Sequence, residues 1–134
     1  MRKAYSAHRG LAVAFALVAL LVGAAGCNDT DERPATWSFI SATIIQPNCA
    51  TSRCHSEGSN VAGLKLDTVQ GGYEALAGYS LGGESDPEAT GLMVRLNGGY
   101  PGIDDVQRMP VDEPLPQADI DLIRKWIAAG AMNN

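Results

Sequence analysis

Cysteine, histidine and aromatic residues are all scarce in this chain. Its 134 residues include three cysteines and two histidines, and aromatic side chains make up only 6% of them. Three cysteines are too few for a disulfide scaffold. The longest apolar run, Leu11–Ala25, is shorter than the roughly 20 residues that a membrane-spanning helix needs. These shortages exclude a disulfide-rich mini-protein and a polytopic membrane protein, and the 46% of hydrophobic residues indicates a folded domain.

Basic residues are also few once the N-terminal segment is set aside. From Cys27 onward the chain has seven basic and fifteen acidic residues, which gives a formal charge of −8 over 108 residues. A protein that binds nucleic acid needs clustered Lys and Arg side chains to neutralise phosphates. The charge balance therefore excludes a nucleic-acid partner. It is compatible with a basic protein partner or with a simply solvated acidic face.

The first 26 residues have the three zones of an export signal. Arg2, Lys3 and Arg9 form a basic start, Leu11–Ala25 is apolar all round, and small residues follow. A buried core helix is the alternative interpretation of the apolar run. We expect residues 1–26 to be a signal peptide and the mature protein to be exported to the periplasm.

A cysteine stands directly after this signal. The sequence Ala24-Ala25-Gly26-Cys27 resembles the lipobox of bacterial lipoproteins, in which the cysteine becomes the lipidated first residue of the mature chain. Ordinary cleavage, which would leave Cys27 as a free thiol or a disulfide partner, is the alternative. The resemblance implies a lipid anchor on Cys27 that holds the protein at a membrane, with residues 27–36 as a flexible tether.

Helical periodicity predicts a helix at each end of the remaining chain and no strand. The first begins after Thr36, which we expect to cap it, and ends at Pro47. The last runs from Gln117 to Ala129 and stops at Gly130. The apolar residues that share one face of these two helices are Trp37, Ile40 and Ile44 in the first and Ile120, Ile123, Trp126 and Ile127 in the last.

Glycine restricts the middle of the chain to short elements. Of the 15 glycines, 11 lie between positions 58 and 102. Only two brief helices are expected there, at 68–76 and at 87–96, with Asp86 as cap of the second and Pro87 at its first helical position. The expected fold is all-α, with short helices and long loops rich in Gly and Pro. Such a small domain usually needs a staple, a metal or a cofactor to be stable.

One motif supplies a candidate for that role. Cys49-Ala50-Thr51-Ser52-Arg53-Cys54-His55 places two cysteines and a histidine within seven residues. Two cysteines followed at once by histidine are the attachment motif of c-type haem. Each sulfur adds to a vinyl group, and the adjacent imidazole reaches the iron from the same side. Four residues separate the cysteines here in place of the usual two, so residues 50–53 must bulge outward.

Three other interpretations of the motif remain open. A disulfide could join Cys49 to Cys54, with His55 incidental. A structural zinc site is another, although it needs four ligands and the motif offers three. Two unpaired thiols are the third. A disulfide would make the protein a haem-free binding or structural lipoprotein.

A second axial ligand, if the chain provides one, is expected to be a methionine. His8 is lost with the signal, which leaves His55 as the only histidine of the mature chain. Met93 lies in an expected helix, where packing explains it, and Met132 is near the end of the chain. Met109 precedes Pro110, which favours an extended backbone and a fixed position. Met109 is therefore the candidate ligand, with gap-filling in a loop as the alternative.

Together these pieces resemble class I cytochromes c, and especially the short monohaem domains of bacterial lipoproteins. The resemblance covers about positions 37 to 131. It rests on the order of a first helix, the Cys49–His55 motif, a Gly63–Asp67 segment, Arg108-Met109-Pro110 and a final helix that ends in Trp126-Ile127-Ala128-Ala129-Gly130-Ala131.

The resemblance implies a small all-α cytochrome c-like fold over residues 37–134, built around one covalent haem c. In such a fold Cys49 and Cys54 carry the thioethers, and His55 and Met109 ligate the iron. The implied activity is single-electron transfer with redox partner proteins, by a monomer that is not an enzyme. A haem enzyme or sensor with an open distal position is the alternative within the same family.

Overall fold

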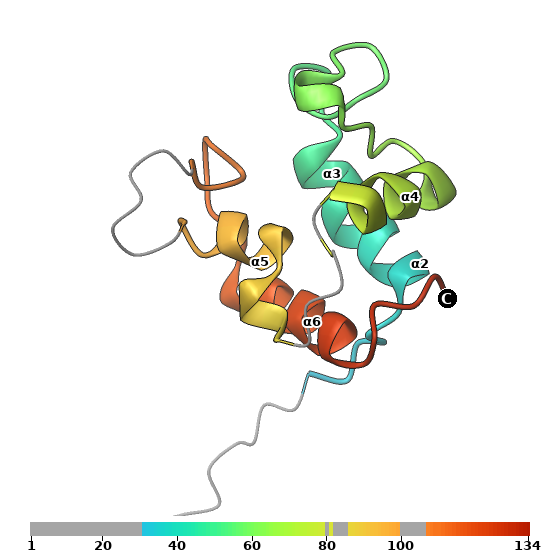
Figure 1. The fold of residues 1–134 in the computed structure, drawn as a ribbon, viewed down its shortest axis with the longest axis vertical. Helices are drawn as coiled ribbons and strands as arrows, with labels where there is room; N and C mark the ends of the chain where they lie inside the picture. Colours follow the sequence, from blue (N-terminus) through green and yellow to red (C-terminus); the bar gives the residue numbers. More distant parts are fainter. Residues whose placement is uncertain (1–30, 80, 82–85, 100–106) are drawn as a thin grey trace, which may run out of the picture. The chain divides into compact units, whose positions relative to one another are not determined.

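A computed structural model describes residues 31–79, 81, 86–99 and 107–134 (Figure 1). Contacts divide the chain into two units, residues 1–30 and 31–134, and only the second is described. The expected signal peptide and the expected lipidation site, Cys27, lie outside the described residues. No helix within the described ranges is long and apolar enough to cross a bilayer.

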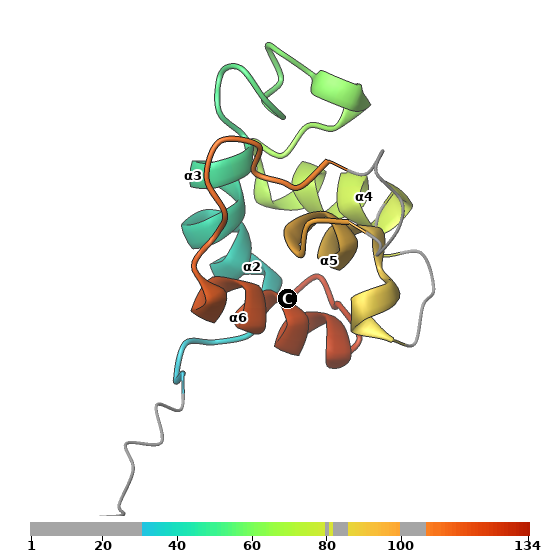
Figure 2. The same cartoon turned by 90° about the vertical axis from the view of Figure 1, so that its left-hand side faces the viewer.

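The described residues are helical and contain no strand, as the sequence predicted. Figures 1 and 2 show α2 and α6, the first and last helices of the described residues, and α4 and α5, which come between them in the sequence. The elements in chain order are α2 Trp37–Ile40, η2 Ser41–Ile45, α3 Gln46–Cys49, η3 Val61–Gly63, α4 Val69–Tyr79, η4 Pro87–Ala89, α5 Gly91–Leu96 and α6 Gln117–Ala128.

The expected end of the first helix at Pro47 is wrong. Helical structure continues through this proline to Cys49, because the wide turn η2 precedes it. In that turn the Gln46 N–H donates to Ser41 O, five residues back. Pro47 then falls in the first turn of α3, the part of a helix that tolerates proline best. The extension matters because it places Cys49 at a helix end.

The expected cap of the first helix is also wrong. Thr36 occupies the N-cap position, but its side chain makes no capping hydrogen bond. The acceptors come instead from the other end of the described chain. The Trp37 N–H donates to Asn134 Oδ1 at 2.9 Å, and the Ser38 N–H donates to the Asn134 carbonyl at 2.8 Å. This long-range cap attaches the last residues to α2.

The two middle helices are present with altered limits. The Thr68 hydroxyl accepts a hydrogen bond from Gly71 N at 3.1 Å, and α4 continues past the expected end at 76 to Tyr79. The expected helix at 87–96 is split. Asp86 accepts from Glu88 N as expected, but only a 3₁₀ turn follows, and α5 starts afresh with Thr90 as its cap.

The core forms around two tryptophans. Trp37 of α2 and Trp126 of α6 lie with ring centroids 5.2 Å apart, and Tyr73 of α4 meets both rings edge-on. Gly72 permits this approach, because a Cβ at that position would lie 3.3 Å from the Trp37 ring. The other buried apolar residues of the core are Ile40, Ile44, Ile45, Leu66, Leu76, Met93, Leu96, Leu115, Ile120, Leu122, Ile123 and Ile127.

The segment before α2 contacts this core unit. Arg33 pairs with Asp31 and with Asp119 of α6. Its hydrogen bonds to both carboxylates raise the pKa of the guanidinium still further, so it remains charged at every accessible pH. The last part of the range expected to be a flexible tether is thus held against α6.

Candidate functional site

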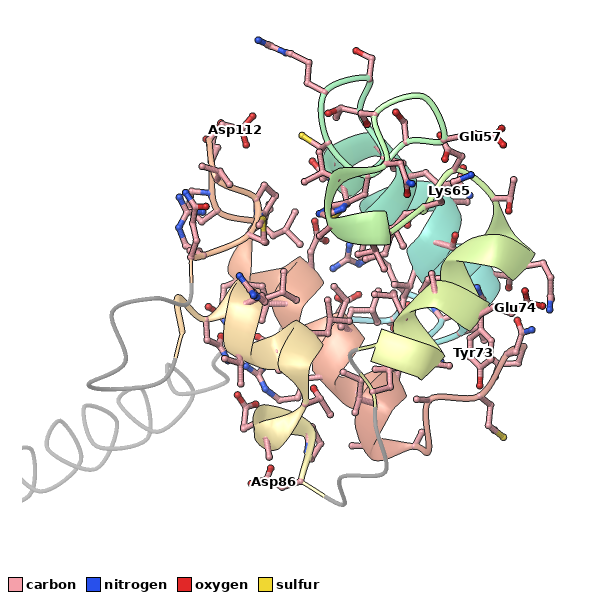
Figure 3. All side chains as sticks on the ribbon, turned by 45° about the horizontal axis from the view of Figure 1, so that its top comes forward. Glu57, Lys65, Tyr73, Glu74, Asp86 and Asp112 are labelled. Atoms are coloured by element: carbon pink, nitrogen blue, oxygen red, sulfur yellow. The ribbon has the colours of Figure 1, made fainter. Side chains whose placement is uncertain are left out.

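A cavity of about 370 Å³ is lined by all four residues that the sequence predicted to bind haem. This volume lies in the range of small-molecule and cofactor pockets. Two segments far apart in the sequence form its walls. The first wall consists of Asn48, Cys49, Thr51, Arg53, Cys54 and His55, and the second of Met109, Pro110, Val111 and Asp112. Figure 3 shows Asp112 on the loop of the second wall.

The first wall is a closed loop at the end of α3. The His55 N–H donates to the Cys49 carbonyl at 2.9 Å, and the Cys54 N–H donates to the Thr51 carbonyl at 2.9 Å. These two bonds fold the four intervening residues back on themselves. Thr51, Ser52 and Arg53 are exposed, whereas Ala50 is half-buried against the core.

The two thiols are free in the structure and half-buried. Burial, and to a lesser degree the neighbouring Cys54, raises the pKa of the Cys49 thiol to about 11. Its sulfur is therefore neutral at physiological pH. Among the described residues, no three His, Cys, Asp or Glu side chains are grouped so that they could hold a metal ion by themselves.

The imidazole of His55 is fixed by a backbone carbonyl. Its Nδ1 lies 3.0 Å from the oxygen of Val61, and since a carbonyl only accepts, Nδ1 carries the proton. The lone pair of the neutral ring is then on Nε2, the atom that ligates metals when the other nitrogen is engaged. The backbone of His55 is also held, because the Leu66 N–H donates to its carbonyl at 2.8 Å.

The second wall is attached to the end of α5. The Met109 N–H donates to the Arg95 carbonyl at 2.9 Å. The Arg108 guanidinium donates to the carbonyls of Pro110 at 2.7 Å and Val111 at 3.4 Å. The loop that presents the Met109 thioether is therefore closed by its own side chain and hydrogen-bonded to a helix.

The other two candidate methionines have different surroundings. Met93 is fully buried in the core, as its place in a helix suggested. Met132 is 57% exposed. Neither lines the cavity, whereas Met109 does.

Three features of the site have little or no signal in the sequence. The Val61 carbonyl is a backbone group, so its residue type says nothing about its role. Arg53 lies within the motif and lines the cavity as a cation, but its exposed position resembles that of any loop arginine. Asp112 reaches the cavity only because its loop folds toward the first wall.

Comparison with known proteins finds no match, whether among protein-family models, curated proteins or solved structures.

Proposed function

We propose that the chain is a c-type cytochrome that carries single electrons, with one haem bound covalently in this cavity. One observation supports the proposal above all. The cavity brings two thiols, an imidazole and a thioether together from two distant parts of the chain. This donor set is the one that the sequence motif and Met109 led us to expect for haem c.

The residues fit such a group chemically. Each thiol forms a thioether when its sulfur bonds to one carbon of a vinyl group and its hydrogen passes to the other carbon. The closed loop between Cys49 and His55 keeps both sulfurs and the imidazole on one wall.

His55 and Met109 would hold the iron, one from each wall of the cavity. His55 can offer Nε2, because its Nδ1 is engaged by the Val61 carbonyl. Met109 can offer its thioether sulfur. When bound, haem supplies an iron that alternates between the ferric and ferrous states. Two protein ligands leave no coordination position for a substrate, and a Met/His pair favours the ferrous state. This is why we favour an electron carrier over an enzyme or sensor.

We extend the proposal to the location of the protein. The basic, apolar and small zones of residues 1–26 and the lipobox-like Ala24–Cys27 are the support. In this proposal the domain is exported to the periplasm, anchored to a membrane by lipid on Cys27, and exchanges electrons there as a monomer with redox partner proteins.

Production with the intact N-terminal segment in a host that matures c-type cytochromes tests the function. We expect a red protein whose mass exceeds that of the processed polypeptide by one haem in addition to any lipid on Cys27, and whose colour survives acid–acetone extraction. A variant in which both Cys49 and Cys54 are replaced by serine is the matched control and should lose the haem to extraction. A colourless wild-type protein whose mass is lower by two hydrogens would show the Cys49–Cys54 disulfide and refute the proposal.

A further inference from the structure

The turn that carries Val61 has an unusual backbone. Asn60 and Ala62, on either side of Val61, have φ of 46° and 55°, and Gly63 follows with φ of 74°. The left-handed region is natural for glycine and acceptable for asparagine, but it is uncommon for alanine. A residue in such a conformation persists only where its surroundings hold it.

Hydrogen bonds hold this turn at its entrance. The Ser59 hydroxyl donates to the Cys54 carbonyl at 2.5 Å and also contacts the Ser56 hydroxyl at 2.8 Å. The Asn60 N–H donates to the Ser56 carbonyl at 2.8 Å. The turn is thus tied directly to the loop that bears Cys54.

This turn places the Val61 carbonyl beside the imidazole of His55. Val61 O lies 3.0 Å from His55 Nδ1, while the Val61 N–H donates to Cys54 O at 3.3 Å. The Val61 side chain is 45% exposed, so core packing of that side chain does not explain the turn. The unusual backbone conformation and the contact with the imidazole are therefore adjacent in one short turn.

We propose that the left-handed turn Asn60–Gly63 is a positioning element that selects the Nδ1–H tautomer of His55. In this tautomer Nε2 has the lone pair that a metal ligand needs, and the imidazole is a stronger donor because its N–H is hydrogen-bonded. Ala62 is then a positioning residue. Its substitution changes the ring's tautomer without removing any side chain that touches the ring. The ligand role of Nε2 rests on the proposed function, whereas the choice of tautomer does not.

The first test uses haem-free protein. Long-range ¹H–¹⁵N NMR at about pH 8, above the ordinary imidazole pKa of about 6.5, identifies the protonated ring nitrogen. A His8→Gln background leaves His55 as the only imidazole. We expect the Nδ1–H form in the parent and in Ala62→Gly, because glycine accepts the left-handed conformation. Ala62→Val should show a mixture, because a β-branched residue resists that conformation. Ala77→Val, at an exposed position of α4, controls for a general effect of the substitution.

The second measurement uses haem-loaded protein. Ala62→Val should have a higher reduction potential than the parent, because the imidazole is a weaker donor, and Ala62→Gly should match the parent. A mixed tautomer in the parent, or an unchanged tautomer in folded Ala62→Val, overturns the inference. If Ala62→Val does not fold, the tautomer of the parent still decides. If haem fails to attach while the NMR pattern appears as expected, the proposed function fails and the positioning role stands.

Discussion

The indole rings of Trp37 and Trp126 lie with their centroids 5.2 Å apart and their planes inclined by 31°. They join α2 to α6, the first and last helices of the described chain. The Trp126 Nε1–H donates to the Met132 carbonyl at 2.9 Å, so the same side chain also holds the residues after α6. The last of these residues, Asn134, caps α2 by accepting a hydrogen bond from the Trp37 N–H. One aromatic contact therefore links both ends of the domain.

Truncating this contact should destabilise the whole domain. Trp126→Ala removes a fully buried indole and its hydrogen bond, and we expect a loss of about 3–5 kcal/mol in the free energy of unfolding. Trp126→Phe keeps most of the apolar surface and should cost clearly less. Urea denaturation followed by circular dichroism measures both. Equal losses for the two variants would mean that the hydrogen bond to Met132, and not ring packing, is the main contribution.

Alkaline conditions should weaken the haem-free protein through Cys49. The pKa of its thiol is raised from 9.0 to about 11 in the folded state, chiefly by burial. A group with a raised pKa stabilises the fold fully below its unfolded pKa, and this contribution is lost as the pH rises through the folded value. Stability should therefore fall between about pH 9 and pH 11. In a Cys49→Ala variant this part of the pH dependence should disappear, and urea titrations at several pH values would show whether it does.

The same thiol should react slowly with alkylating agents. At pH 8 a thiol with a pKa of about 11 is ionised to only about one part in a thousand, and the thiolate is the reactive form. A Cys27→Ser, Cys54→Ser background leaves Cys49 as the single thiol. Its rate with iodoacetamide should keep rising beyond pH 10 in folded protein. In denaturant the rate should level off near pH 9, and the absence of this difference would contradict the burial of Cys49.

Replacing Met109 should open one axial position. In haem-loaded protein we expect Met109→Ala to lower the reduction potential and to allow carbon monoxide or cyanide to bind, because the thioether that favours ferrous iron is gone. Met132→Ala is the matched control, since that side chain is exposed and does not line the cavity. Unchanged potential and unchanged ligand access in Met109→Ala would mean that Met109 is not a ligand and that the distal position is already open.

The Met109 loop should depend on the guanidinium of Arg108. Arg108→Gln removes the hydrogen bonds to the carbonyls of Pro110 and Val111. We expect a loss of about 1 kcal/mol in stability and faster hydrogen exchange at the Met109 amide. Arg108→Lys retains a cation that can donate to one carbonyl. Its stability and its exchange rate should lie between those of the parent and of Arg108→Gln. Parent-like exchange in Arg108→Gln would show that the bond from Met109 N–H to Arg95 O holds the loop alone.

Local patterns in the sequence predicted the parts of the fold that depend on local interactions. The stripe of Ile120, Ile123, Trp126 and Ile127 predicted α6, and all four side chains are buried. The helix end expected at Pro47 is wrong, because the effect of this proline depends on where a wide helical turn falls. The cap expected from Thr36 is wrong because the true cap comes from Asn134, almost a hundred positions away. Contacts over such distances leave no periodic signal.

The residues of the candidate site also fall into those that the sequence could predict and those that it could not. Cys49, Cys54 and His55 are adjacent in the sequence, so their grouping could be predicted from residue types. Met109 could be selected by eliminating the other methionines, but its place in the same cavity comes from the folded chain. The Val61 carbonyl could not be predicted at all, because backbone direction is set by the φ values of its neighbours, Asn60 and Ala62.

The two walls of the cavity depend on different amounts of folded chain. The Cys49–His55 wall is one short continuous stretch, so in the proposed cytochrome covalent attachment would require only local chain and could precede folding of the remainder. The second wall, which carries Met109, is hydrogen-bonded to Arg95 of α5. It meets the first wall only after the chain between them has folded. If the proposal holds, Met109 would therefore reach the haem only after this folding, and closure of the haem to added carbon monoxide would report the fraction of molecules that have reached the native state.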